Sequence, residues 1–184
     1  MLTKQKIRKI YFKKRKKKYF EVDQNFFRPL INLLNKHRRE KTIHLSLYYP
    51  SNYEVNTIKI IELLEGKKNI KTLLPVIKSS NQMIFSKWNF FDVLKVNRFG
   101  ILEPINKKPF IPNVALVPLL AYDKNNFRLG YGKGYYDRFF NKYLLLNKKI
   151  LTIGVAFSFQ KYHKLPISKF DVKLDYVLTE KGIF

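Results

Sequence analysis

The residues best suited to chemistry lie between positions 128 and 137, in the sequence RLGYGKGYYD. The stretch contains three alternating glycines, which let backbone N–H groups approach an anion without interference from a Cβ atom. Arg128 and Lys133 add positive charge, and an expected helix begins directly afterwards, with an N-terminus that attracts anions. The glycines are Gly130, Gly132 and Gly134. The pattern therefore predicts a phosphate-binding loop between a strand and a helix.

The glycine spacing excludes two common nucleotide motifs. Neither G-x-x-x-x-G-K-[ST] nor G-x-G-x-x-G occurs in the stretch. An ordinary glycine-rich turn is the alternative, and two cations with neighbouring tyrosines make it the weaker interpretation. Asp137 falls in the first turn of the expected helix, where its carboxylate can hold a Mg²⁺ ion that bridges to a nucleotide phosphate.

Other reactive side chains lack a diagnostic spacing. Glu54 follows a predicted strand and is expected to begin a helix, which suits either a ligand contact at a sheet edge or a favourable helix-terminal charge. Asp171 and Asp175 are spaced i,i+4, and either one can join Asp137 in a metal site or lie at the surface. The histidines have no metal-ligand spacing, and the serines lie in no nucleophile elbow. These residues are His37, His44, His163, Ser79, Ser80 and Ser158.

The composition fits one domain spanning residues 1–184, with 46% hydrophobic residues to build its core. No apolar run is long enough to span a bilayer, so no membrane association is expected. Cysteine is absent, which removes thiolate catalysis and disulfides and predicts a cytoplasmic protein.

The net charge of +24 permits a second function, that of a basic nucleic-acid-binding protein. The enrichment in lysine runs along the whole chain, however, as a coding bias toward Lys, Asn, Ile, Phe and Tyr would produce. We therefore expect weak attraction to anions rather than a specific nucleic-acid site.

Residues 2–20 are predicted to form a basic helix. Lys4 and Arg8 share a helix face and either clamp an anion or lie in solvent, while the run from Lys13 to Lys18 is expected to be solvated. The expected apolar stripe consists of Leu2, Ile7, Ile10, Tyr11 and Phe20.

Helical and extended patterns alternate along the rest of the chain. This order predicts a three-layer α/β/α fold with a largely parallel central sheet, in addition to the basic N-terminal helix. Further helices are expected at 23–37, 54–65 and 134–146, strands at 43–49, 72–77, 83–88, 114–121, 150–157 and 176–179, and an ordered loop at 97–104.

The stretch VPLLAYDKNNFRLGYGKGYYDRF resembles the signature of the 5-formyltetrahydrofolate cyclo-ligase family, also called methenyltetrahydrofolate synthetases. Weaker agreement comes from Lys4 and Arg8, and from YYPSNYEVNT, NRFGILEP, GVAFSFQ and LPISKFDVKLDYVLTE, all in the family's order. The resemblance implies ATP- and Mg²⁺-dependent conversion of 5-formyltetrahydrofolate, with or without a polyglutamate tail, to 5,10-methenyltetrahydrofolate, with release of ADP and phosphate. The formyl oxygen is expected to take the γ-phosphate of ATP, after which N10 closes the ring. A monomer is expected.

Site roles follow from the same resemblance, position by position. Lys4, Arg8 and residues 128–136 correspond to ATP contacts, and Lys133, Arg128 and Tyr135 to the catalytic groups. Tyr49, Glu54 and residues 131–135 correspond to folate contacts, with Met83 and Trp88 as further candidates for the folate pocket. Asp137 and Asp171 correspond to the Mg²⁺ ligands. The nucleotide stretch comprises Arg128, Leu129, Gly130, Tyr131, Gly132, Lys133, Gly134, Tyr135 and Tyr136.

The chain departs from the family pattern at three places. Asn126-Phe127 stands where a glycine and a variable residue are usual, Phe170 stands where bacterial members often have His, and Tyr131 occupies a position that is often Gly or Arg. These departures leave open a family member that binds nucleotide without turnover.

Overall fold

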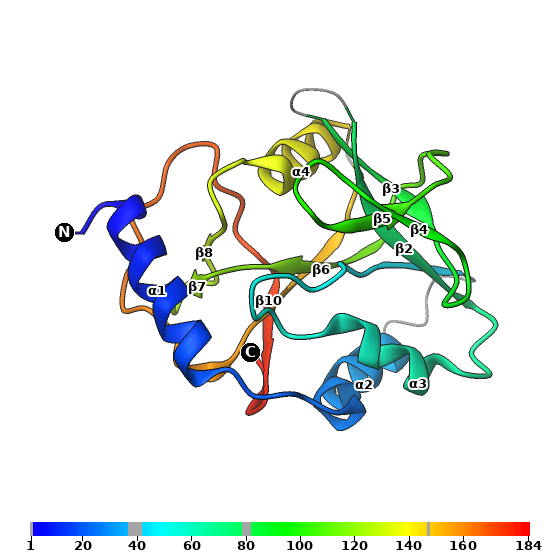
Figure 1. Cartoon of the computed structure of the whole chain (residues 1–184), viewed down its shortest axis with the longest axis horizontal. Helices are drawn as coiled ribbons and strands as arrows, with labels where there is room; N and C mark the ends of the chain where they lie inside the picture. The colour runs from blue at the N-terminus through cyan, green and yellow to red at the C-terminus, as the bar shows by residue number, and fades with distance from the viewer. Residues whose placement is uncertain (1, 37–41, 79–81, 147) are drawn as a thin grey trace.

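The computed structural model describes residues 2–36, 42–78, 82–146 and 148–184, within which seven strands form the main sheet (Figure 1). The strand order is β11-β10-β9-β6-β1-β2-β3, in which the pairs from β10 to β2 are parallel and the edge strands β3 and β11 are antiparallel. The expected α/β fold with a largely parallel sheet is confirmed. The strands are β1 (Ile43–Ser46), β2 (Ile70–Ile77), β3 (Met83–Lys87), β6 (Val114–Pro118), β9 (Leu151–Val155), β10 (Tyr176–Thr179) and β11 (Gly182–Ile183).

Helices cover both faces of this sheet, as Figure 1 shows. On one face, α2 (Arg28–Lys36) and α3 (Ile61–Leu64) pack with the 3-10 turns η1 (Gln24–Phe27) and η2 (Thr57–Ile60). On the other face lies α4 (Tyr135–Leu145). Successive β6 residues face opposite layers, because Leu116 belongs to the first core cluster whereas Ala115 and Val117 belong to the second. A strand buried on both faces reads as a continuous apolar run, which explains the sequence of β6.

The N-terminal helix α1 (Lys4–Lys18) packs beside the short ribbon formed by β7 (Ala121–Tyr122) and β8 (Arg128–Leu129). Its buried residues are Ile7, Tyr11 and Arg15. The expected apolar stripe is wrong at its other three positions, since Leu2, Ile10 and Phe20 are 40%, 49% and 43% exposed. The expectation of a fully solvated run at 13–18 is also wrong, because Arg15 is only 1% exposed.

Three other segments differ from expectation. Residues 54–56 form a loop rather than the start of a helix, and the helical turns begin at Thr57. The expected loop at 97–104 contains β5 (Leu102–Pro104), which pairs with β4 (Leu94–Val96) in a separate ribbon. The apolar run 114–121 breaks after Pro118, because its last residue belongs to β7 rather than to β6. Within the described ranges, no helix is long and apolar enough to cross a bilayer.

The turn between β7 and β8 has an asparagine at position 126, where the family resemblance leads us to expect a glycine. Asn126 adopts a left-handed backbone with φ +62°, which Asn tolerates better than most residues other than Gly. Buried Asp123 accepts hydrogen bonds from the backbone N–H groups of Asn125 at 2.9 Å and Phe127 at 3.1 Å. The Asn126 side-chain amide also donates to the Asp175 carbonyl at 3.2 Å, which ties the turn to the segment before β10.

We predict that Asn126→Gly is more stable than Asn126→Ala by about 1 kcal/mol, because alanine resists the left-handed backbone. Both variants lack the side-chain amide of Asn126, so the difference between their stabilities measures the cost of the left-handed backbone conformation. At positions with ordinary backbone angles the alanine variant is the more stable one, because glycine gains more conformational freedom on unfolding. Urea unfolding of the two variants measures the difference, and an alanine variant at least as stable as the glycine variant would contradict it.

Candidate active site

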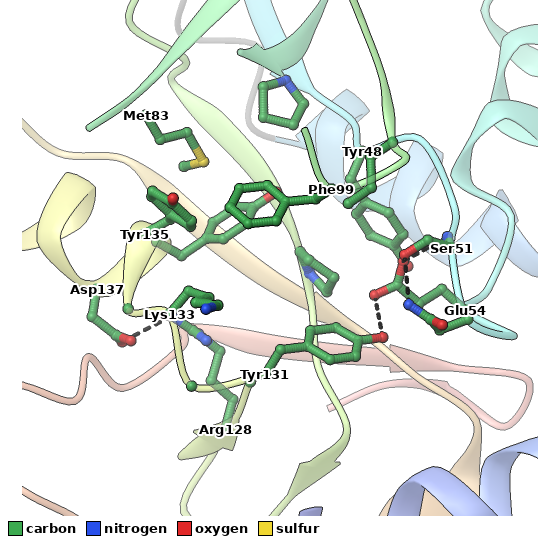
Figure 2. A pocket seen from close by; sticks show the side chains of 18 of the residues that line it. Tyr48, Ser51, Glu54, Met83, Phe99, Arg128, Tyr131, Lys133, Tyr135 and Asp137 are labelled. Atoms are coloured by element: carbon green, nitrogen blue, oxygen red, sulfur yellow. Dashed lines mark hydrogen bonds and ion pairs between the residues drawn. The ribbon is translucent and has the colours of Figure 1, made fainter. Parts of the chain in front are cut away.

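A cavity of about 500 Å³ lies at the edge of the sheet where the parallel strands end (Figure 2). Its wall includes the C-terminal residues of β2 and β6, the loop after β1, and residues of α1 and α4. Parallel α/β sheets commonly bind ligands at this edge. The sequence-predicted site residues that line the cavity are Lys4, Arg8, Tyr49, Glu54, Met83, residues 128–137 and Asp171.

Two predicted candidates lie elsewhere. Trp88 is 2% exposed in the core, with its indole N–H donating to the Asp92 carbonyl at 3.4 Å, so it does not line the cavity. The Asp175 carboxylate accepts from the backbone N–H of Thr152 at 2.7 Å and from its hydroxyl at 2.9 Å, which joins β9 to the segment before β10. His37, Ser79 and Ser80 lie outside the described residues.

The glycine loop, residues 130–134, needs its glycines for backbone conformation and for space. Gly132 and Gly134 have φ values of +96° and +66°, which L side chains rarely adopt. A Cβ atom on Gly132 would lie 3.1 Å from the Arg8 guanidinium carbon, and Arg8 Nε donates to the Gly130 carbonyl at 2.9 Å. The loop thus lies against α1, and a side chain at Gly132 would crowd the Arg8 guanidinium in addition to straining the backbone.

The N-terminus of α4 faces the cavity with a glycine at its cap. Gly134 supplies no side-chain hydrogen bond, and both Gly134 and Tyr135 line the cavity. The first backbone N–H groups of a helix have no partner within the helix and bind anions well. The structure therefore combines the two features that the sequence predicted for phosphate binding.

Cations and carboxylates alternate beside the loop. Arg128 and Asp137 form an ion pair at 2.8 Å, with side chains 5% and 20% exposed, and Lys4 pairs with Asp171. Burial by itself would raise the pKa of Asp171, but the Lys4 ammonium and the Ser168 N–H outweigh it and hold that pKa below its ordinary value. The ionised form of the Asp171 carboxylate is therefore favoured.

Two buried polar atoms on the cavity wall lack a hydrogen-bond partner among the described residues. They are the Arg128 Nε group and the Tyr136 hydroxyl. Buried polar groups are nearly always paired in folded proteins, so these two unpaired groups are exceptions in the cavity wall. The positive charge of Arg128 suits an anion.

The donor set also fits a magnesium ion. Asp137 and Asp171 both line the cavity, and in the described part of the chain Asp137 Oδ2 and Asp171 Oδ1 take part in no hydrogen bond. No group of three or more His, Cys, Asp or Glu residues suited to a metal occurs in the described ranges. Mg²⁺ typically uses one or two carboxylates together with substrate phosphates and water, so two carboxylates suffice. Phe170 points to solvent and is 66% exposed.

Glu54 lies on the opposite side of the cavity, in a turn rather than at a helix start (Figure 2). Its carboxylate accepts from the Ser51 N–H at 2.9 Å, the Ser51 hydroxyl at 3.3 Å and the Tyr131 hydroxyl at 2.7 Å. It is 6% exposed, and this burial raises its pKa although nearby Arg15 acts in the opposite direction. Because no helix begins there, the alternative role of a helix-terminal charge is wrong.

Several residues of the cavity wall escaped prediction. Phe99 lies in the quoted stretch NRFGILEP, which gave no role to any residue, yet its ring centroid is 6.2 Å from that of Tyr135. Tyr48 is buried beside Tyr49, and its hydroxyl donates to the Val55 carbonyl at 3.0 Å. The other unpredicted wall residues are Ser51, Asn52, Pro75, Ile77, Asn97, Ile101 and Pro118.

Comparison with known proteins identifies relatives of similar length. Residues 2–180 match the model of the 5-formyltetrahydrofolate cyclo-ligase family. The 5-formyltetrahydrofolate cyclo-ligase of Haemophilus influenzae is 30% identical over 166 residues, which cover 86% of each chain. That of Mycoplasma pneumoniae is 32% identical over 167 residues, covering 82% of this chain and 98% of the relative.

A solved structure agrees with the sequence comparisons. The NMR structure of 5,10-methenyltetrahydrofolate synthetase from Aquifex aeolicus superposes with a TM-score of 0.75 at 29% identity. The superposition covers 99% of this chain and 92% of that one. With the fold, the glycine loop and the match over residues 2–180 in agreement, this chain belongs to the 5-formyltetrahydrofolate cyclo-ligase family.

Proposed function

We propose that the cavity is where this cyclo-ligase joins ATP to 5-formyltetrahydrofolate and closes the methenyl ring. One observation carries the assignment: the same cavity is lined by the glycine loop with Lys4, Arg8 and Arg128, and by buried Glu54. Figure 2 shows Arg128 and Glu54 on opposite sides of it. The first group suits a polyphosphate, and a carboxylate suits the N–H donors of a pterin ring.

The reaction needs a better leaving group than the formyl oxygen. That oxygen attacks the γ-phosphorus as the N5 lone pair forms a C=N bond, and the bond from the γ-phosphorus to ADP breaks. N10 then attacks the activated carbon and loses its proton, and phosphate leaves with the former formyl oxygen. The product is 5,10-methenyltetrahydrofolate, with ADP and phosphate.

The chain's residues contribute position and charge to this reaction. Arg128 and Lys133 neutralise the transferred phosphoryl group, and the loop N–H groups hold its oxygens. Lys4 and Arg8 bind the remaining phosphates from α1. Tyr135, at the start of α4, lies between the nucleotide and the folate, while Tyr49, Met83 and Glu54 hold the pterin. No protein nucleophile is required, in keeping with a chain that has no cysteine.

Asp137 and Asp171 would hold the Mg²⁺ ion. Bound there, the ion neutralises phosphate charge during transfer. The two carboxylates already balance Arg128 and Lys4, so they keep these cations ordered beside the phosphate site.

We further propose a monomeric enzyme of the cytoplasm. Every residue assigned above comes from one chain, so a second copy is not needed to complete the cavity. The lack of cysteine fits a reducing compartment.

The direct test is formation of the methenyl chromophore. Purified protein with ATP, Mg²⁺ and 5-formyltetrahydrofolate should increase methenyl absorbance and release one ADP per product. A non-hydrolysable ATP analogue should give no increase. Folded protein that binds nucleotide but produces no chromophore would overturn the assignment in favour of a member without turnover.

Lys133→Ala should reduce kcat/KM for ATP by about 10- to 100-fold, the effect of one hydrogen bond to a charged group. Lys133 is exposed, so the melting temperature should stay the same. Steady-state kinetics and thermal unfolding measure the two effects. Lys124→Ala, an exposed lysine outside the cavity wall, is the matched control. Equal kinetics in both variants would remove Lys133 from the phosphate site.

Asp137→Asn should raise the Mg²⁺ concentration for half-maximal activity by about tenfold or more, because a charged ligand is replaced by a neutral one. Magnesium titrations at saturating ATP measure the change. Asp175→Asn serves as control, since that carboxylate bonds Thr152 and does not line the cavity. If both variants keep the wild-type magnesium dependence, Asp137 is only the partner of Arg128.

A further inference from the structure

Arg15 is the one side chain of the basic run at 13–18 that is buried, and it joins three segments. Its guanidinium donates to the Leu119 carbonyl at 3.0 Å, just after β6, and to the Asn52 carbonyl at 2.7 Å. It also donates to the Tyr131 hydroxyl, and its Cζ lies 5.5 Å from that ring's centroid. One cation thus contacts the sheet edge, the Glu54 turn and the glycine loop.

The Tyr131 hydroxyl links Arg15 to Glu54, on the proposed folate side of the cavity. The hydroxyl accepts a hydrogen bond from Arg15. It donates one to Glu54 Oε1 at 2.7 Å, and Figure 2 shows this second bond. Burial, with the Glu54 charge next in importance, raises the pKa of Tyr131, so the hydroxyl keeps the proton that it donates. The series Arg15–Tyr131–Glu54 places a positive charge behind the carboxylate without direct contact between the two charges.

The turn that carries Glu54 needs such support. Asn52 and Tyr53 have φ values of +50° and +63°, two consecutive residues other than glycine in a left-handed backbone. This backbone conformation is unfavourable for residues other than glycine, and it persists only when surrounding contacts hold it. Arg15 holds the Asn52 carbonyl, and Ser51 holds Glu54 Oε2.

Burying Arg15 is itself unfavourable. A guanidinium taken out of water loses hydration that its new contacts offset only in part, and within the described residues its Nε group has no partner. An apolar side chain would fill the space at lower cost, as Ile7 and Tyr11 do on the same helix face. The charge is thus better explained by what it holds than by stability.

We propose that Arg15 is a positioning residue for the folate site, which orients Glu54 through the Tyr131 hydroxyl and the Asn52 carbonyl. It touches neither ATP nor folate: it fixes the carboxylate that receives the pterin. This inference rests on the proposed assignment of Glu54 to the folate.

The test compares Tyr131→Phe, Arg15→Met and Arg15→Lys, with Lys17→Met as an exposed control on the same helix. Tyr131→Phe keeps the ring and removes only the hydroxyl. KM for 5-formyltetrahydrofolate should rise about 5- to 10-fold in this variant and at least as much in Arg15→Met, while KM for ATP stays within about twofold. Lys17→Met should match the wild type.

A pH profile separates positioning from general support of the fold. The groups facing Glu54 are Arg15 from α1, Tyr131 from the loop, Tyr48 and Ser51 beside the turn, and Tyr136 from α4. Binding of folate by the carboxylate is lost as pH falls through the Glu54 pKa. Arg15→Met removes the positive charge that opposes the rise of this pKa, so the acid limb of kcat/KM for folate should move to higher pH. Arg15→Lys should keep the wild-type limb, because it retains the charge.

Three results would overturn the proposal: equal rises in both KM values, a lower melting temperature with unchanged kinetics, or tighter folate binding in Tyr131→Phe. Should Arg15→Met not fold, Arg15→Gln, which also removes the charge, replaces it in the same measurements. Glu54→Gln tests the underlying assignment separately, since unchanged folate KM there shows that Glu54 does not bind the pterin. A wild type without methenyl formation would instead remove the proposed function itself.

Discussion

The site depends on how α1 attaches to the rest of the molecule. Ile7 and Tyr11 dock as buried apolar side chains, and Phe12 packs half-buried against the same cluster. The charged anchors are Lys4 to Asp171, Arg8 to Gly130, and buried Arg15 to three acceptors. Each charged contact reaches a different segment around the cavity. Without the helix, the glycine loop and the Glu54 turn would lose the hydrogen bonds that α1 donates to them. The helix therefore forms part of the cavity wall as well as packing against the β7–β8 ribbon.

Charge in the cavity is nearly balanced before any substrate arrives. Arg128 faces Asp137 and Lys4 faces Asp171, while Arg15 and Glu54 are linked through a neutral hydroxyl. Such pairs keep long side chains in place that would otherwise have to be ordered when phosphate binds. The proposed polyphosphate and divalent cation would add charges of both signs, and among the described residues Asp137 Oδ2 and Asp171 Oδ1 accept no hydrogen bond that such a cation would displace. The proposed ligands would thus add further opposite charges to a cavity wall in which cations and carboxylates already lie side by side.

The fold was predictable because its strands and long helix have local signatures. The apolar run of β6 and the glycine-to-helix transition at Gly134 depend on neighbours in the sequence. Trp88, Glu54 and Arg15 show where such reasoning fails. Aromatic character does not say whether Trp88 faces a core or a cavity, and the turn before Thr57 is fixed by Arg15, which is distant in the sequence. Arg15 looks like its exposed neighbours Lys16 and Lys17, since burial is decided by the segments packed against it.

The turn at Asn126 illustrates a smaller limit of prediction from the sequence. The family pattern favours glycine there, and its absence suggested a changed turn, yet the left-handed backbone is kept by a residue that also tolerates it. Asp123 and the Asn126 amide stabilise the conformation from both sides. This position requires a left-handed backbone angle, which more than one residue type can adopt, so the residue type alone does not reveal the conformation.

The partners of α1 lie far along the chain, which has a consequence for how the protein is made. Sequence separations are 116 between Arg15 and Tyr131, 122 between Arg8 and Gly130, and 167 between Lys4 and Asp171. During synthesis the chain emerges from its N-terminus onward, so α1 leaves the ribosome long before these partners exist. The basic helix must wait until the glycine loop, and then the segment around Asp171, have been made. Helix α1 is thus synthesised before its partners yet is among the last elements to reach its place, and the proposed active-site cavity is complete only once the segment around Asp171 has been made.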